Sequence, residues 1–164
     1  MKIVHMVKYG CGQWEDYHED VEYMYESFNE AKQKCLQLQS EIDKRLQDNQ
    51  RWYDTLDKLD EENIEGIYNE TTEKTSCAVS FYEFVDSPKD FPEILGLFSQ
   101  EMQGKLLLYA EAEEYVNSIS IFDNDFDNPH YFMSVYKLLD DGSMKWIDSY
   151  SSGQLEDLQC LKLN

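Results

Sequence analysis

The residues best suited to chemistry are the carboxylates of one short segment, Asp123-Asn124-Asp125-Phe126-Asp127-Asn128. Acids at its first, third and fifth positions match the first half of an EF-hand loop, where they would surround a calcium ion. The seventh position is Pro129, and the twelfth is Ser134 where a bidentate Glu is required. We therefore expect an acidic turn here and assign no metal ligand to it.

Motifs that mark enzymes are missing from the sequence. There is no G-x-G-x-x-G or G-x-x-x-x-G-K-[ST] phosphate loop and no G-x-S-x-G nucleophile motif. Cys11 could pair with His5 or His18, but no third group that would orient the histidine can be named. We expect no catalytic residue, no cofactor and no enzyme activity. A metal-binding regulator that uses the loop at His18 or the one at Asp123 ranks last among the functions considered.

The composition is strongly acidic. It sets 14 Lys and Arg against 34 Asp and Glu, a formal net charge of −20 at pH 7. Nucleic-acid phosphates and anionic lipids both attract Lys and Arg, so this balance argues against direct binding of nucleic acid and against a membrane surface. It favours a cationic partner, and nucleic-acid-binding grooves are the commonest large cationic surfaces on proteins. The alternative is that the charge only keeps the protein dispersed in solution.

The acids are concentrated where basic residues are missing. No Lys or Arg occurs between Lys105 and Lys137. Acids at alternate positions of a strand would share a face about 6.6–6.8 Å apart, near the spacing of phosphates along a nucleic-acid strand. Alternatively, the rings in this stretch form a core face and the acids its solvated face. We expect a partner-binding surface made of Glu111, Glu113, Glu114, Asp123, Asp125, Asp127, Tyr115 and Phe126.

The first quarter of the chain predicts a hairpin followed by a helix. Residues 2–9 and 21–26 have the composition of two strands. Ser27 and Glu30 then have the spacing of a helix capping box, in which each side chain binds the other's backbone N–H. Apolar residues follow at spacings of three and four, which predicts one buried helical stripe at Phe28, Ala31, Cys35, Leu38 and Ile42.

This stripe weakens near Asp48-Asn49 and resumes at Trp52, Leu56 and Leu59. Either one helix of about 30 residues continues to Leu59, or two helices meet at a break near residues 48–49. We favour the break because so long a helix is unusual in a globular domain. A continuous helix would need a cover for its far half. Trp52, Leu56 and Leu59 are therefore a possible oligomer interface, and a homodimer is the alternative hypothesis.

The remainder predicts further strands and one helix. Residues 76–85 and 118–122 are expected strands, residues 64–72 and 106–113 are ambiguous and taken as short strands, and residues 93–103 fit a helix. Residues 131–139 and 144–150 flank Asp140-Asp141-Gly142-Ser143, a tight-turn sequence. The expected fold class is α+β: a mostly antiparallel sheet of five to seven strands with one long or two shorter helices on one face.

We expect a single domain over residues 1–164, with possible sub-lobes at 1–60 and 61–164, because 164 residues can bury a sizeable core. Four cysteines, Cys11, Cys35, Cys77 and Cys160, are far apart and include no C-x-x-C pair. No apolar run approaches the length of a membrane span, and no charged segment leads into an apolar one at the N-terminus. The expected location is the cytoplasm, with reduced thiols and Cys11 the most exposed of them.

Two resemblances bear on function. The opening hairpin followed by Ser27-Phe28-Asn29-Glu30-Ala31 resembles a unit found in many small phage and bacterial proteins. In charge and size the chain is similar to acidic inhibitors such as phage anti-defence proteins and nuclease immunity proteins. That likeness implies an inhibitor that imitates nucleic acid and occupies the basic surface of a nucleic-acid-handling protein. This likeness assigns no functional role to any individual residue of this sequence.

Overall fold

The computed structural model describes residues 2–13, 17–119 and 128–158. The chain forms two compact units. The sheet unit consists of Met1–Leu46 and Ser120–Asn164, and the helical unit of Gln47–Ile119 lies between them in the sequence. Each unit is described by itself below. The expectation that residues 1–164 form a single domain stays a prediction.

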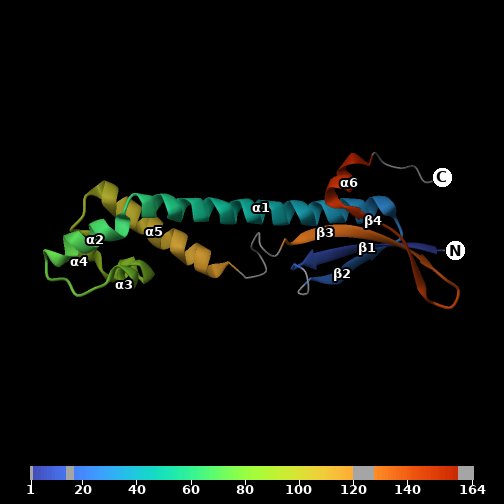
Figure 1. Ribbon diagram of the computed structural model, residues 1–164, viewed down its shortest axis with the longest axis horizontal. Helices are drawn as coiled ribbons and strands as arrows, with labels where there is room; N and C mark the ends of the chain where they lie inside the picture. The colour runs from blue at the N-terminus through green and yellow to red at the C-terminus, as the bar shows by residue number, and fades with distance from the viewer. Residues whose placement is uncertain (1, 14–16, 120–127, 159–164) are drawn as a thin grey trace. The chain divides into compact units, whose positions relative to one another are not determined.

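The sheet unit contains four antiparallel strands: β1 (Lys2–Cys11), β2 (His18–Tyr25), β3 (His130–Leu138) and β4 (Met144–Ser151). Their order across the sheet is β2-β1-β3-β4 (Figure 1). Both predicted hairpins are confirmed. Gly142 supports the tight turn of the second one, because its φ of 82° lies in the region that side chains with a Cβ avoid.

Helices cover one face of this sheet. The first part of α1 (Phe28–Glu61) and the short α6 (Ser152–Asp157) pack on it. Ser27 begins α1 as expected, because its hydroxyl accepts the backbone N–H of Glu30. The predicted stripe lies in the resulting core, where Ala31 and Cys35 meet Val7 of β1 and Met133 of β3. Cys11, predicted to be exposed, is instead buried because it is the last residue of β1, inside the sheet.

The break predicted near Asp48-Asn49 is wrong, because α1 is one helix of 34 residues. The segment contains no Gly or Pro, the residues that usually interrupt helices. Asn49, which weakened the apolar pattern, is buried, and its Oδ1 accepts a hydrogen bond from the hydroxyl of Tyr115 at 3.1 Å. A paired polar group is tolerated in a core, so the helix continues through this position.

The helical unit contains the end of α1, then α2 (Ile64–Glu73), α3 (Phe81–Asp86), the 3₁₀ turn η2 (Pro88–Asp90), α4 (Pro92–Leu95) and α5 (Gln100–Ser118). The strands expected at 64–72, 76–85 and 106–113 are therefore wrong. Residues 64–72 and 106–113 are helical, and 76–85 consists of a turn, an irregular segment and the first turns of α3. Most of the strand expected at 118–122 lies outside the described residues.

The error over residues 76–85 has a local cause. The Ser80 hydroxyl accepts the backbone N–H of Glu83 and caps α3, whereas the mixed apolar run around it resembles a strand. Phe81, Phe84 and Val85 then share the buried side of a helix. The helix expected at 93–103 is divided at Gly96–Ser99, because the Ser99 hydroxyl caps a new helix by accepting the N–H of Met102.

An aromatic cluster forms the core of the helical unit. The ring of Tyr68 in α2 contacts the rings of Phe81, Phe84 and Phe98 at centroid distances of 5.2–5.8 Å. Its buried hydroxyl donates to the carbonyl of Val79, which satisfies the one polar group of the cluster. Leu106 of α5 is fully buried against the same cluster. The α+β class and the antiparallel sheet are thus confirmed, with four strands among the described residues.

Leu106→Ala should lower the free energy of unfolding by about 2–5 kcal/mol, because it leaves a cavity in this core. Leu108→Ala is the matched control, since the same side chain two residues along α5 is 38% exposed and should cost less than about 1 kcal/mol. Urea unfolding of both variants, followed by circular dichroism, measures the difference. Equal losses would contradict the packing described for α5.

Candidate partner-binding surface

Helix α5 sets the positions of three predicted acids. It buries Leu106, Tyr109 and Ala112, so residues between them face outward or lie at its margins. The expectation that Glu111 and Glu113 share the face of a strand is wrong, because this segment is helical. At about 100° per residue, Glu111 and Glu114 lie on one side of the helix and Glu113 lies nearer the opposite edge.

Two adjoining grooves bring these acids together with others. One, of about 480 Å³, lies between the α3–η2 segment and α5 and is lined by Asp86, Asp90, Glu111 and Glu114 among others. The second, of about 420 Å³, is lined by Asp86, Glu113 and Glu114 with Asn117 and Ser118. Asp86 and Glu114 line both grooves. We call the five carboxylates the acidic surface: Asp86, Asp90, Glu111, Glu113 and Glu114.

These carboxylates are not neutralised within the protein. None of them forms an ion pair with a Lys or Arg in the described ranges, although Lys89 lies in the first groove. The helical unit as a whole has five Lys and Arg against 17 Asp and Glu, a net charge of −12. A Lys or Arg of a binding partner could therefore pair with these carboxylates without displacing an ion pair within the described part of this protein.

The pKa of Glu113 responds to the negative electrostatic potential that the neighbouring carboxylates create. Burial raises the pKa of this carboxyl above its usual value of 4.5, and the nearby charges of Asp86 and Asp60 raise it further. The Asp60 carboxylate also accepts a hydrogen bond from the Tyr109 hydroxyl at 3.1 Å. Burial is the main cause that raises the pKa of the Tyr109 phenol, and this hydrogen bond and the charges of Asp60 and Glu113 raise it further. Negative charge is thus concentrated enough around Glu113 to oppose its own ionisation.

Apolar contact area beside the acids comes from residues that the sequence did not single out. Tyr82 of α3 is 55% exposed and its hydroxyl donates to Glu65 at 3.3 Å, while Leu107 of α5 is 43% exposed and lines the first groove. Asp86 and Asp90 were likewise missed. The signal for Asp86 was present, because a helical interpretation of residues 81–86 places it outside the buried side formed by Phe81, Phe84 and Val85.

The other predicted site residues lie elsewhere. Tyr115 is not on the acidic surface, because its ring stacks on Trp52 of α1 at 5.4 Å and its hydroxyl donates to Asn49. Asp123, Asp125, Phe126 and Asp127 lie outside the described residues.

The predicted oligomer stripe packs within the helical unit. Leu59 is buried in its aromatic core, Leu56 packs against that core, and Trp52 is half-buried against Tyr115. A second copy would have to displace these contacts in order to reach Leu59. The cover that a continuous helix required is therefore provided by α5 and the core of the same unit.

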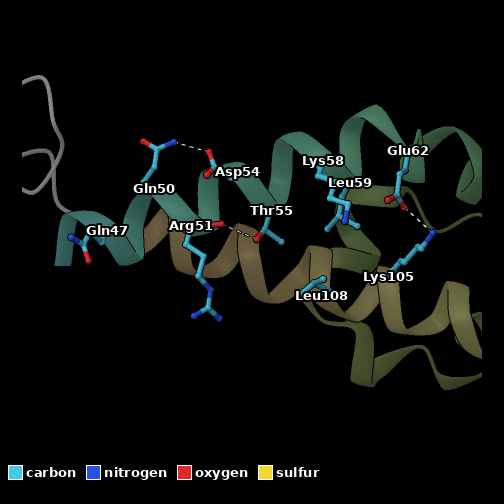
Figure 2. A pocket seen from close by; sticks show the side chains of 10 residues that line it. All are labelled: Gln47, Gln50, Arg51, Asp54, Thr55, Lys58, Leu59, Glu62, Lys105 and Leu108. Atoms are coloured by element: carbon cyan, nitrogen blue, oxygen red, sulfur yellow. Dashed lines mark hydrogen bonds and ion pairs between the residues drawn. The ribbon is translucent and has the colours of Figure 1, made fainter. Parts of the chain in front are cut away.

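Basic side chains gather in a different groove, between α1 and α5. It has a volume of about 600 Å³, and Arg51, Lys58 and Lys105 line it, three of the five basic residues of the helical unit. Lys105 is bound by Glu62 at 2.7 Å and by Glu101 at 3.3 Å, and Figure 2 shows it reaching from α5 toward Glu62. These cations lie apart from the acidic surface, in a groove that Asp54 and Glu62 also line.

The described residues contain no group of three or more His, Cys, Asp or Glu arranged to hold a metal ion. Burial raises the pKa of the Cys35 thiol to about 12, which leaves it protonated and unreactive at neutral pH. No helix within the described ranges has the length and apolar character needed to cross a bilayer. The acidic surface is thus the candidate functional feature of the helical unit.

Asp86→Asn should lower the pKa of Glu113 toward its usual value, because it removes the first of the two charges that repel the Glu113 carboxylate. Glu83→Gln, a control on the same helix α3, removes a charge that does not act on Glu113 and should leave its pKa unchanged. An NMR titration of the Glu113 side chain measures both. If Asp86→Asn left the pKa of Glu113 unchanged, that result would contradict the proximity of the two acids.

The same shift makes stability depend on pH. The pKa of Glu113 is higher in the folded state than in the unfolded chain, so the folded state binds this proton more tightly. Its contribution to stability is complete below the unfolded value of about 4.5 and is lost as the pH rises through the folded value. Glu113→Gln should remove this part of the pH dependence of unfolding.

No protein-family model, no curated protein and no solved structure matches this chain. Its function is therefore inferred from the charge, exposure and packing of the residues described above.

Proposed function

We propose that this protein is an acidic binding protein that occupies the basic surface of a nucleic-acid-handling protein and so blocks it. The acidic surface of the helical unit makes the contact. Its carboxylates take the place of nucleic-acid phosphates, and the partner's Lys and Arg bind them. The cytoplasm is the expected place of action, because the scattered cysteines of the sequence suit a reducing compartment.

One observation carries this proposal: five carboxylates from α3, η2 and α5 line two adjoining grooves and form no ion pair within the part of the chain that the structure describes. A surface that serves only solubility usually mixes both signs of charge. Here burial raises the pKa of Glu113, and repulsion from the nearby charges of Asp86 and Asp60 raises it further. A cationic partner would relieve that repulsion, so part of its binding energy would come from electrostatics already present in the fold.

The apolar side chains at the margin of the acidic surface suit the same role. Leu107 is exposed and lines the first groove, and Tyr82 is exposed on the same short helix as Asp86. They supply contact area that carboxylates alone lack. Aromatic residues are enriched in protein interfaces, where a ring packs against the partner while its hydroxyl stays hydrated. The combination favours a protein partner with a basic groove over a simple polycation.

The triple variant Glu111→Gln/Glu113→Gln/Glu114→Gln should lose the partner. The control Asp57→Asn/Glu61→Gln/Glu73→Gln removes the same charge from exposed positions of α1 and α2 outside both grooves. A pull-down from host lysate at low salt, eluted with rising salt, should recover one nucleic-acid-binding protein with the wild type and the control. The triple variant should bind it at least about tenfold more weakly, because each close charge pair contributes on the order of 1 kcal/mol or more.

Salt provides the second criterion, because screening weakens attraction between exposed opposite charges. Elution at moderate salt agrees with the proposal. Equal capture by the wild type and the triple variant, or an affinity that is the same at low and high salt, would refute it.

Binding of a cationic partner should also release a proton. The partner's positive charge stabilises ionised Glu113 and lowers its pKa, so affinity should fall as the pH is lowered through that pKa. Calorimetry in two buffers with different ionisation enthalpies measures the proton release near the Glu113 pKa. Glu113→Gln should abolish Glu113's share of the release, and a release that persists in full would place the titrating group elsewhere.

A further inference from the structure

Among the described residues, no helix of the sheet unit packs on the second face of the four-stranded sheet. The sheet unit's helices, α1 and α6, pack together with Val7, Met133 and Leu155 on one face (Figure 1). Side chains alternate between faces along a strand, so the strand register assigns the residues of the other one. We call it the open face, and its apolar members are Val4, Met6, Val21, Met24, Phe132, Tyr136, Leu138, Met144 and Trp146.

Large apolar side chains on this face are in contact with water. On the edge strand β2, Met24 is 62% exposed and Val21 is 50% exposed. On the opposite edge strand β4, Trp146 is 57% exposed and Met144 is 50% exposed. Between these edges the face is closely packed, since Met6 on β1 is 5% exposed and Ser134 on β3 is 2% exposed. An antiparallel sheet that faces water usually carries polar residues there, so exposed apolar side chains along both edge strands mark a candidate interaction site.

The charges of the open face are paired with one another. Lys8, at its centre, binds Glu19 at 3.4 Å and donates to the Tyr136 hydroxyl at 3.0 Å. The Lys8 ammonium also lies over the rings of Phe132 and Tyr136, 5.8 and 5.4 Å from their centroids. At one end, Lys2 binds Glu26 at 2.5 Å. The face therefore offers neither free carboxylates to a basic partner nor free cations to an acidic one.

We propose that the open face binds the open face of a second copy of this chain, as two sheets packed on one another. The partner must be apolar and carry no unpaired charge at the contact, and the same face of another copy meets both conditions. A two-fold axis places identical patches together, which is the commonest arrangement of homodimers. Face-to-face sheets lie about 10 Å apart with interdigitated side chains, and the large residues on β2 and β4 fill such a layer.

The size of the face is sufficient for a weak dimer. Four strands spaced about 4.8 Å apart, each about eight residues long at about 3.4 Å per residue, cover roughly 500 Å² per copy. Two copies would bury on the order of 1,000 Å², near the lower limit for a specific interface. The dimer is therefore expected to exchange with monomer as concentration changes.

The net charge opposes this association and gives it a characteristic dependence on salt concentration. Each copy carries a formal charge of −20, so two copies repel at long range and salt screens that repulsion. The dimer should become tighter as salt rises, whereas binding through the acidic surface should weaken. This opposite salt dependence keeps the outcome separate from that of the proposed function.

Sedimentation velocity of the full chain over a range of concentrations tests the inference, at about 0.05 M and about 0.5 M NaCl. The wild type should shift from monomer to dimer with concentration, and more readily at the higher salt. Trp146→Asp should weaken the dimer at least about tenfold, because it buries an unpaired charge at the contact. Met24→Asp, on the opposite edge strand, is the second variant and should do the same.

Ile67→Asp is the matched control. It adds the same charge at an apolar side chain that is 40% exposed on α2 of the helical unit, and it should leave the dimer intact. The triple variant of the acidic surface should also remain dimeric. Circular dichroism establishes that each variant is folded. A wild type that stays monomeric at high concentration and high salt would overturn the proposal, as would dimers of Trp146→Asp and Met24→Asp as tight as the wild type.

Discussion

Helix α1 is the constraint on which both units depend. Its first part contributes Ala31, Cys35 and Ile42 to the core under the sheet, and its last part contributes Leu59 to the aromatic core of the helical unit. A helix of this length is stabilised mainly by tertiary packing of its apolar stripes. Each unit therefore needs its own half of the helix to complete its core, and substitutions at Asn49 would act where the two stripes meet in the sequence.

Charge is sorted in the helical unit rather than spread evenly. Among the described residues, the carboxylates of α3, η2 and α5 lie together and form no ion pair, while Lys105 is held between Glu62 and Glu101 in the groove on the α1 side. Burial is the main cause of the raised pKa of Glu113, and repulsion from Asp86 and Asp60 adds to it, so ionising this carboxyl costs stability. Such a cost is typical of functional sites, where strain in the free protein is relieved by a ligand. The acidic surface and the open sheet face thus differ in the physical force available to them: electrostatic attraction for one, burial of apolar area for the other.

Local patterns predicted the elements whose signals are strong and short in range. The Asp-Gly turn between β3 and β4, the Ser27 cap and the stripe from Phe28 to Ile42 depend only on neighbouring residues, and all three are present. The helices at 64–73 and 81–86 were missed, as was the part of α5 after residue 103, because short apolar runs suit a buried strand and a buried helix equally well. The caps at Ser80 and Ser99 decide between them in the structure.

The sequence by itself determined the amount of negative charge, its excess after Lys105 and the α+β class. It also singled out Glu111, Glu113 and Glu114, but on the wrong premise that they lie on a strand. Tertiary structure alone decided that Asp86 and Asp90 join them across a groove and that Tyr115 turns away to pack on Trp52. It also decided that the described helices of the sheet unit pack on one face of the sheet, while Met24 and Trp146 are exposed on the other. The physical reason is range: charge and periodicity are properties of neighbouring residues, whereas convergence and exposure depend on which distant segments pack against each other.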